Sequence, residues 1–152
     1  MITINRETDY AARVLLHLTL QGAGQRVTAR QIAERRLIPQ ALVRRVVSRL
    51  SAAGLIVTLR GSDGGIWLAR PPSQVSLLDV VEAFEGPLAL NVCTVEPGTC
   101  PLTPDCPVHR EWMHARYILR SVLAQITFDK LAHRKEGAPE SRPESASLIY
   151  NL

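Results

Sequence analysis

The feature that most restricts the fold is a basic amphipathic helix followed at once by a glycine-rich hairpin. Apolar side chains recur on one face of the helix expected over residues 39–53: Leu42, Val43, Val46, Val47 and Leu50. The other face is polar and basic: Gln40, Arg44, Arg45, Ser48 and Arg49. Strand-forming residues at 55–60 and 66–69 flank the glycine-rich turn at 61–65, which is typical of a hairpin.

A shorter helix at 29–35, with Thr28 as its N-cap, precedes this pattern. Helix, turn, helix and hairpin in this order predict a winged helix-turn-helix domain over residues 1–70. Three further segments are expected: a linker helix with a cysteine-bearing loop (71–107), a dimerisation helix (108–133) and a flexible tail (134–152). The expected fold class is therefore mostly α, with a two-stranded wing, a cysteine-bearing loop and a long C-terminal dimerisation helix.

Charge is divided unevenly along the chain, whose formal net charge is +4. Residues 1–70 hold eleven arginines and four acidic residues, a formal charge of +7, and residues 71–152 have a formal charge of −3. A basic half that contains a helix-turn-helix is expected to bind a polyanion, here a double-stranded DNA operator. The residues expected to contact DNA are Thr28, Arg30, Gln40, Arg44, Arg45, Ser48, Arg49, Arg60 and Gly61.

The segment after the cysteines predicts a second kind of interface. From Val108 to Ile126, apolar residues recur every three or four positions, near the period of a helix that packs lengthwise on another helix. In a chain of 152 residues the expected partner is a second copy, because such DNA-binding domains commonly read paired half-sites. A core helix within a single chain is the alternative.

Three cysteines, Cys93, Cys100 and Cys106, lie within fourteen residues, and His109 follows the last of them by three positions. An odd number of cysteines without an export signal favours metal binding or redox chemistry over a disulfide framework. Structural zinc sites commonly use Cys-x-x-Cys pairs, which this sequence lacks, whereas a wide, proline-stiffened loop suits a larger inorganic core. We therefore expect an iron–sulfur cluster, with a zinc site or a thiol switch as the alternative.

The fourth ligand of such a cluster must come from elsewhere, because the chain offers only three thiols. His109, Asp9 and Glu7 are the candidates. An acidic residue in the first turns of a helix is also favourable through the helix dipole alone, which gives Asp9 an ordinary structural explanation. A cluster with one ligand other than a thiolate is expected to respond readily to oxidants, nitric oxide or loss of iron, which suits a sensor.

As a set, these motifs resemble the bacterial winged-helix regulators typified by IscR, NsrR and RirA, the Rrf2 family of iron–sulfur and nitric-oxide responsive repressors. The resemblance covers about residues 1–133. It is carried by the following segments: Thr8 to Ala11, the wing at 60–65, the linker at 75–83, the cysteine loop, and residues 126–131.

The resemblance implies that Cys93, Cys100 and Cys106 ligate a 2Fe-2S or a 4Fe-4S cluster. IscR-like members add a histidine three residues after the last cysteine, which matches His109. NsrR-like members instead take an aspartate from the first helix of the other subunit, which matches Asp9. His109 is preferred here because it needs no reach between subunits, and Asp9 is the alternative.

The expected function is that of a cluster-containing transcriptional regulator, as a repressor, that binds DNA as a homodimer and responds to redox, nitric oxide or iron status. A cluster-free repressor that works through thiols or zinc is the alternative, followed by an electron-transfer or interaction protein. No phosphate-binding glycine loop or nucleophile elbow occurs, so neither an enzyme nor a small-molecule substrate is expected. Without a membrane span or an export signal, a cytoplasmic protein is expected.

Overall fold

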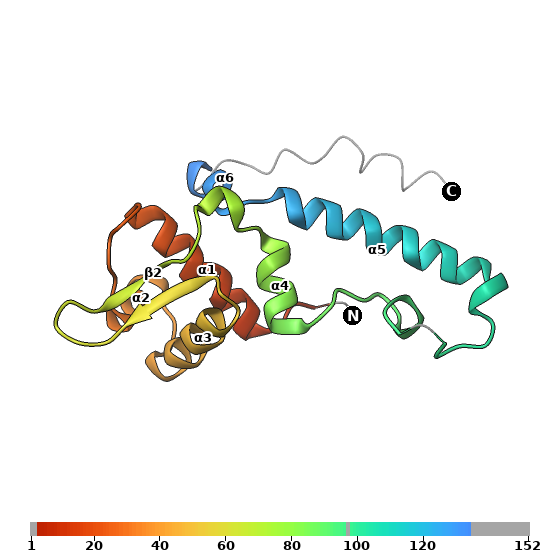
Figure 1. Cartoon of the computed structure of the whole chain (residues 1–152), viewed down its shortest axis with the longest axis horizontal. Helices are drawn as coiled ribbons and strands as arrows, with labels where there is room; N and C mark the ends of the chain where they lie inside the picture. Colours follow the sequence, from red (N-terminus) through yellow and green to blue (C-terminus); the bar gives the residue numbers. More distant parts are fainter. Residues whose placement is uncertain (1–2, 97, 135–152) are drawn as a thin grey trace.

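The computed structural model describes residues 3–96 and 98–134, which form a winged-helix body and a long helix that projects from it (Figure 1). The helices are α1 (Arg6–Gln21), α2 (Ala29–Arg36), α3 (Gln40–Ala52), α4 (Leu77–Glu85), α5 (Pro107–Gln125) and α6 (Phe128–His133). The strands are β1 (Ile56–Leu59) and β2 (Gly65–Leu68), and short 3₁₀ turns occur at η1 (Pro72–Gln74), η2 (Val92–Thr94) and η3 (Thr103–Asp105). The prediction of a mostly α-helical winged fold is confirmed.

The helix-turn-helix consists of α2 and α3, and local chemistry fixes the ends of both helices. Thr28 caps α2 through a capping box with Gln31, in which each side chain binds the other residue's backbone N–H. The chain leaves α2 through Leu37 in the left-handed conformation, at φ 53°. Pro39 then precedes the first turn of α3, where its fixed φ suits the start of a helix.

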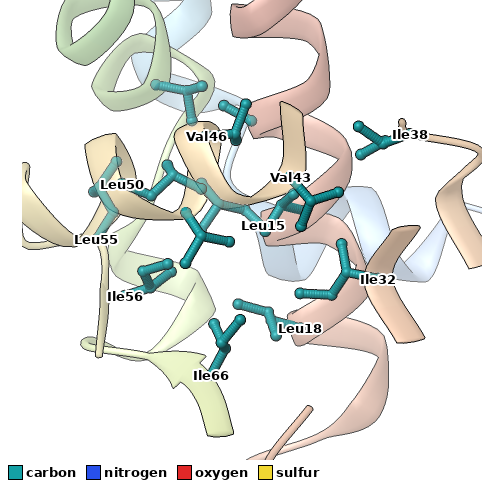
Figure 2. Close-up of a cluster of buried hydrophobic side chains, with 14 of the residues drawn as sticks. Leu15, Leu18, Ile32, Ile38, Val43, Val46, Leu50, Leu55, Ile56 and Ile66 are labelled. Carbon is teal, nitrogen blue, oxygen red and sulfur yellow. The ribbon is translucent and has the colours of Figure 1, made fainter. Parts of the chain in front are cut away.

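The core lies where α1, α2 and α3 meet the hairpin, and Figure 2 shows its aliphatic side chains pointing toward one another. One face of α1 is buried here and carries four apolar residues: Ala11, Val14, Leu15 and Leu18. On α3 the buried residues are Val43, Val46, Val47 and Leu50. Each large aliphatic side chain buried in this way stabilises the fold by about 1.5–3 kcal/mol, so the position of α3 is set by its apolar face.

The wing is the antiparallel pair of β1 and β2, in which Ile56 faces Leu68 and Leu59 faces Gly65. Val27, just before α2, forms an isolated bridge to Ile66 of β2 and holds the hairpin against the helix-turn-helix. Gly64 must lack a side chain, because an added Cβ would collide with the Leu59 carbonyl oxygen. The wing is therefore attached to the body at its base and closes in a tight turn at its tip.

The segment expected as one dimerisation helix over residues 108–133 is divided into two helices. α5 ends at Gln125, and Thr127 pairs with Ser76 in an isolated bridge before α6 begins. The Phe128 backbone N–H donates to the Val75 carbonyl, and the Phe128 side chain is fully buried in the core. This division has a physical cause, because burial of a large aromatic ring draws the chain after α5 back onto the body.

No side chain of α5 is fully buried in the single chain. Several large apolar residues on α5 are exposed: Val108, Trp112, Met113, Tyr117, Ile118 and Val122. Within the described residues, no helix has the length and apolar character to cross a membrane. The predicted flexible tail lies outside the described residues except for residue 134.

Candidate nucleic-acid interface and cysteine loop

The outer face of α3 presents four of the residues expected to bind DNA. Gln40, Arg44, Arg45 and Ser48 are all exposed. They follow one another at helical spacing on the side opposite the buried valines, because the apolar side of α3 is fixed in the core. This face combines guanidinium groups with an amide and a hydroxyl, which are donors suited to phosphates and base edges.

A groove of about 740 Å³ separates α3 from the wing. Arg44 and Ser48 line it from α3, and Arg60 and Gly61 line it from the wing. Thr28 also contributes to the groove wall, although its hydroxyl already serves the capping box of α2. The structure thus brings together most of the expected DNA-contacting residues around one open, basic groove.

Arg30 and Arg26 each make a contact that the sequence pattern did not predict. The Arg30 guanidinium pairs with Glu34 of the same helix at 2.8 Å, and both side chains are largely exposed. Arg26, which sequence reasoning did not single out, stacks over the Trp67 ring with 5.3 Å between the guanidinium carbon and the ring centroid. It also donates a hydrogen bond to the Asp63 carbonyl at the wing tip. Arg26 therefore braces the wing, and no local motif marks this role.

Arg49 faces the body of the protein rather than the groove. Its Nη1 lies 2.9 Å from Glu7 Oε2 on α1, and its Nη2 donates to the Phe84 carbonyl oxygen of α4 at 3.0 Å. Arg45 reaches the other Glu7 oxygen at 3.0 Å. Glu7 was a candidate cluster ligand, but both of its carboxylate oxygens accept from arginines in this structure.

The cysteine loop, defined as residues 88–106, lies at the far end of α5 from α6, on the opposite side of the molecule from the wing (Figure 1). Cys93 lies in η2, and Cys106 is the N-cap of α5. All three cysteines are free thiols of intermediate exposure. Because α5 begins at Pro107, it presents His109 in its first turn, directly beside the thiols.

Two of the thiols meet at His109. Its Nδ1 lies 3.3 Å from Cys93 Sγ, and its backbone N–H donates to Cys106 Sγ at 3.4 Å. Cys100 is held on the same loop, where its carbonyl oxygen accepts from the Thr103 backbone N–H at 3.1 Å. The structure thus places the thiols of Cys93 and Cys106 against His109, whereas the ligand set predicted from the sequence also includes Cys100.

Soft thiolates beside an imidazole have the right chemistry for iron–sulfur or zinc ligation. In the described part of the chain, however, no three His, Cys, Asp or Glu side chains are gathered tightly enough to hold a metal ion. The donor types fit the group chemically, but the three thiols and His109 must all draw closer together to complete a site.

Asp9 lies in a separate place, on α1. Its carboxylate pairs with Arg13 one turn further on, at 2.7 Å. It lines a groove between α1, α4 and α5, together with Leu77, Val81 and Leu123. Asp9 is thus available to a second chain that packs into this groove, which is the setting that a ligand from another subunit requires.

Comparison with known proteins agrees with this architecture. A family model described as "Iron-dependent Transcriptional regulator" (Rrf2) matches residues 4–134. The HTH-type transcriptional regulator NsrR of Oceanobacillus iheyensis is 31% identical over 137 residues, which cover 89% of this chain and 92% of that protein.

Two solved structures share the fold. The structure of CymR, the global cysteine regulator of B. subtilis, has a TM-score of 0.69 at 23% identity, covering 87% of this chain and 97% of that chain. T. potens IscR has a TM-score of 0.69 at 22% identity, covering 93% of this chain and 94% of that chain. Since the family model spans most of the chain and the NsrR relative matches along nearly its whole length, the chain belongs to the Rrf2 family of transcriptional regulators, which are not enzymes.

Proposed function

We propose that this chain is a homodimeric DNA-binding repressor whose affinity for its operator is controlled by an iron–sulfur cluster on the cysteine loop. The observation that carries the proposal is that Cys93 and Cys106 both contact His109, where the cysteine loop leads into the helix α5. The cluster would make the protein sensitive to redox state, nitric oxide or iron supply. Cys93, Cys100 and Cys106 would hold it, with His109 as the fourth ligand or Asp9 of the partner subunit in its place.

The DNA-binding half of the proposal rests on α3 and the wing. α3 would lie in a major groove, with Gln40, Arg44, Arg45 and Ser48 at phosphates and base edges. Arg60 and Gly61 would meet the backbone beside it, and Thr28 and Arg30 would add contacts at the start of α2. The formal charge of +7 on residues 1–70 supports this orientation toward a polyanion.

The homodimer is supported by the exposed apolar face of α5. A helix of 19 residues with no fully buried side chain and several exposed large apolar ones is stabilised by a partner surface that covers its apolar face. The groove lined by Asp9, Leu77, Val81 and Leu123 lies beside it and is itself largely apolar. A dimer also suits paired half-sites, because each copy contributes one α3 helix.

A physical path connects the cysteine loop with α3. The loop follows directly after α4, and the last turn of α4 offers the Phe84 carbonyl to Arg49 of α3. A change of cluster state that moves the loop would therefore act on α4, and α4 is bonded to the helix that reads DNA. A coupling of about 1–3 kcal/mol would change operator affinity by roughly 5–150-fold.

A second candidate is a regulator of the same fold that uses thiol or zinc chemistry without a cluster. It is favoured by one observation: in the described residues the thiols of Cys93 and Cys106 each contact His109, but no three His, Cys, Asp or Glu side chains are gathered around a point that could hold a metal. Two thiols beside one histidine suit a pair of reactive thiols, or a zinc ion once the donors close around it, as well as a cluster.

The decisive experiment is anaerobic purification with a visible spectrum and assays of iron, sulfide and zinc. The proposal predicts a brown protein whose chromophore is lost in Cys93→Ala and kept in His114→Ala, a control histidine on α5 outside the loop. Comparison of His109→Ala with Asp9→Ala then identifies the fourth ligand, because only the true ligand alters the spectrum. A colourless wild-type protein without iron would overturn the cluster and favour the second candidate.

A further inference from the structure

Arg116 of α5 donates hydrogen bonds to the cysteine loop at two points. Its Nε donates to the Leu88 carbonyl oxygen at 2.6 Å, and its Nη1 donates to the Thr94 carbonyl oxygen at 2.8 Å. The two carbonyls stand at the start of the loop and directly after Cys93. One half-buried guanidinium therefore closes the segment that carries Cys93 against α5.

The same segment is folded tightly around Cys93 by its own hydrogen bonds. Thr94 is buried, its hydroxyl donates to the Asn91 carbonyl oxygen at 2.6 Å, and its backbone N–H donates to the same oxygen at 3.0 Å. These bonds make a rigid turn, but they do not attach the turn to the rest of the protein. Arg116 supplies that attachment.

The position of Arg116 on α5 explains why its two hydrogen bonds to the loop bring Cys93 to His109. Arg116 follows His109 by seven positions, which is close to two helical turns, so both side chains lie on one face of α5. A loop segment held by Arg116 must run along this face toward His109. Cys93 Sγ accordingly lies 3.3 Å from His109 Nδ1.

We propose that Arg116 is the positioning residue of the cysteine loop, which holds Cys93 beside His109 before any cluster is bound. The inference rests on the proposed function only for what the cysteines bind, because the two hydrogen bonds of Arg116 are made to protein carbonyls. A guanidinium is suited to the role since it remains charged and its fork of N–H donors reaches two carbonyls at once. A lysine ammonium at this position would satisfy one of the carbonyls more readily than both.

The test is the alkylation of each cysteine by iodoacetamide in the metal-free, reduced protein, followed by mass spectrometry. In Arg116→Ala, the rate at Cys93 relative to that at Cys106 is expected to rise about tenfold, because the turn is released from α5. Arg120→Ala is the matched control, since it also removes a half-buried arginine of α5 but breaks a bond to Glu82 of α4. Its ratio should equal that of the wild-type protein.

The ratio of the two alkylation rates distinguishes a loss of positioning from a general loss of structure, because unfolding accelerates the alkylation of both cysteines together. Arg116→Lys should give an intermediate ratio.

In the cluster-loaded protein, Arg116→Ala should also lose its visible absorbance to a chelator faster than Arg120→Ala. Equal ratios in Arg116→Ala, Arg120→Ala and wild type would overturn the inference. A wild-type protein without a cluster would instead contradict the proposed function, while the alkylation ratio would still decide the role of Arg116.

Discussion

Arg49 and Glu7 form an ion pair of 2.9 Å that ties the third helix, α3, to the first turn of α1. The same guanidinium donates to the Phe84 carbonyl at 3.0 Å and lies 4.2 Å from the centroid of the Phe84 ring. Arg49 thus joins three helices from a single side chain. Its location on the polar face of α3 suggests a DNA contact, whereas its bonds are those of a structural brace.

Replacement of Arg49 by alanine is expected to lower the free energy of unfolding by about 1–3 kcal/mol, since a hydrogen-bonded charge and a cation–π contact are lost together. The side chain is 37% exposed, so solvent screening places the effect toward the lower end of this range. Urea denaturation measures it, with exposed Arg44→Ala as the control that should change stability little. Equal stability of the two variants would show that Arg49 does not brace the fold.

The groove between α3 and the wing leads to a prediction about salt. In the proposed complex Arg44 and Arg60, which line this groove, each meet one phosphate. Arg44→Ala and Arg60→Ala should therefore each make the plot of log affinity against log salt less steep, by about 0.9. Fluorescence anisotropy with a labelled duplex at several KCl concentrations measures this slope. Arg110→Ala is the control, as an exposed arginine on α5 outside the groove. An unchanged slope for both groove variants would contradict the proposed DNA face.

Local patterns were sufficient to predict most of the body. Thr28 caps α2 as expected, because capping depends on residues within one turn of each other. The apolar spacing of α3 likewise predicted its buried face, since helical periodicity alone decides which side chains share a face.

Contacts between distant segments were not predictable in this way. Arg49 binds Phe84, Arg116 binds Leu88, and Phe128 enters the core only because the chain turns back after α5. A charged residue on a polar helix face looks the same in the sequence whether its partner is DNA, solvent or a carbonyl elsewhere in the fold. The cysteine spacing led to a predicted ligand set on the cysteine loop, but it does not reveal that Arg116 bonds to this loop.

His17 should make stability depend on pH. It is a buried residue of α1, and burial, together with the nearby Arg36 and Arg35, lowers its pKa below the ordinary value of 6.5. Above pH 6.5 the imidazole is neutral in both the folded and the unfolded chain, so His17 does not make the free energy of unfolding depend on pH. As the pH falls below it, the unfolded chain takes up a proton that the folded chain resists, so the free energy of unfolding decreases.

The measurement compares wild type and His17→Gln by urea denaturation from about pH 7.5 to about pH 5.5. Wild type should lose more stability than the variant over this interval, and the difference between the two should develop below the ordinary histidine pKa. His133→Gln, at the exposed end of α6, is the control and should follow wild type. Parallel curves for His17→Gln and wild type would exclude His17 as the source of the pH dependence.

The exposed face of α5 leads to a prediction about assembly. Val122 is half exposed in the single chain, so Val122→Glu should leave the fold of one chain intact. In a dimer that buries this face, the same change places an unpaired carboxylate against apolar side chains. A cost of about 3 kcal/mol would raise the dimer dissociation constant roughly a hundredfold, which sedimentation velocity over a concentration series measures.

Leu59→Glu is the matched control for this experiment, because Leu59 is also half exposed but lies on the wing. It should sediment as wild type does. Val122→Glu should also weaken binding to a duplex with two half-sites more than binding to a single half-site, since only the former depends on a linked pair of α3 helices. If Val122→Glu remained dimeric at the concentrations where wild type is dimeric, α5 would not be the dimer interface, and the exposed apolar residues around Tyr117 would require a different partner.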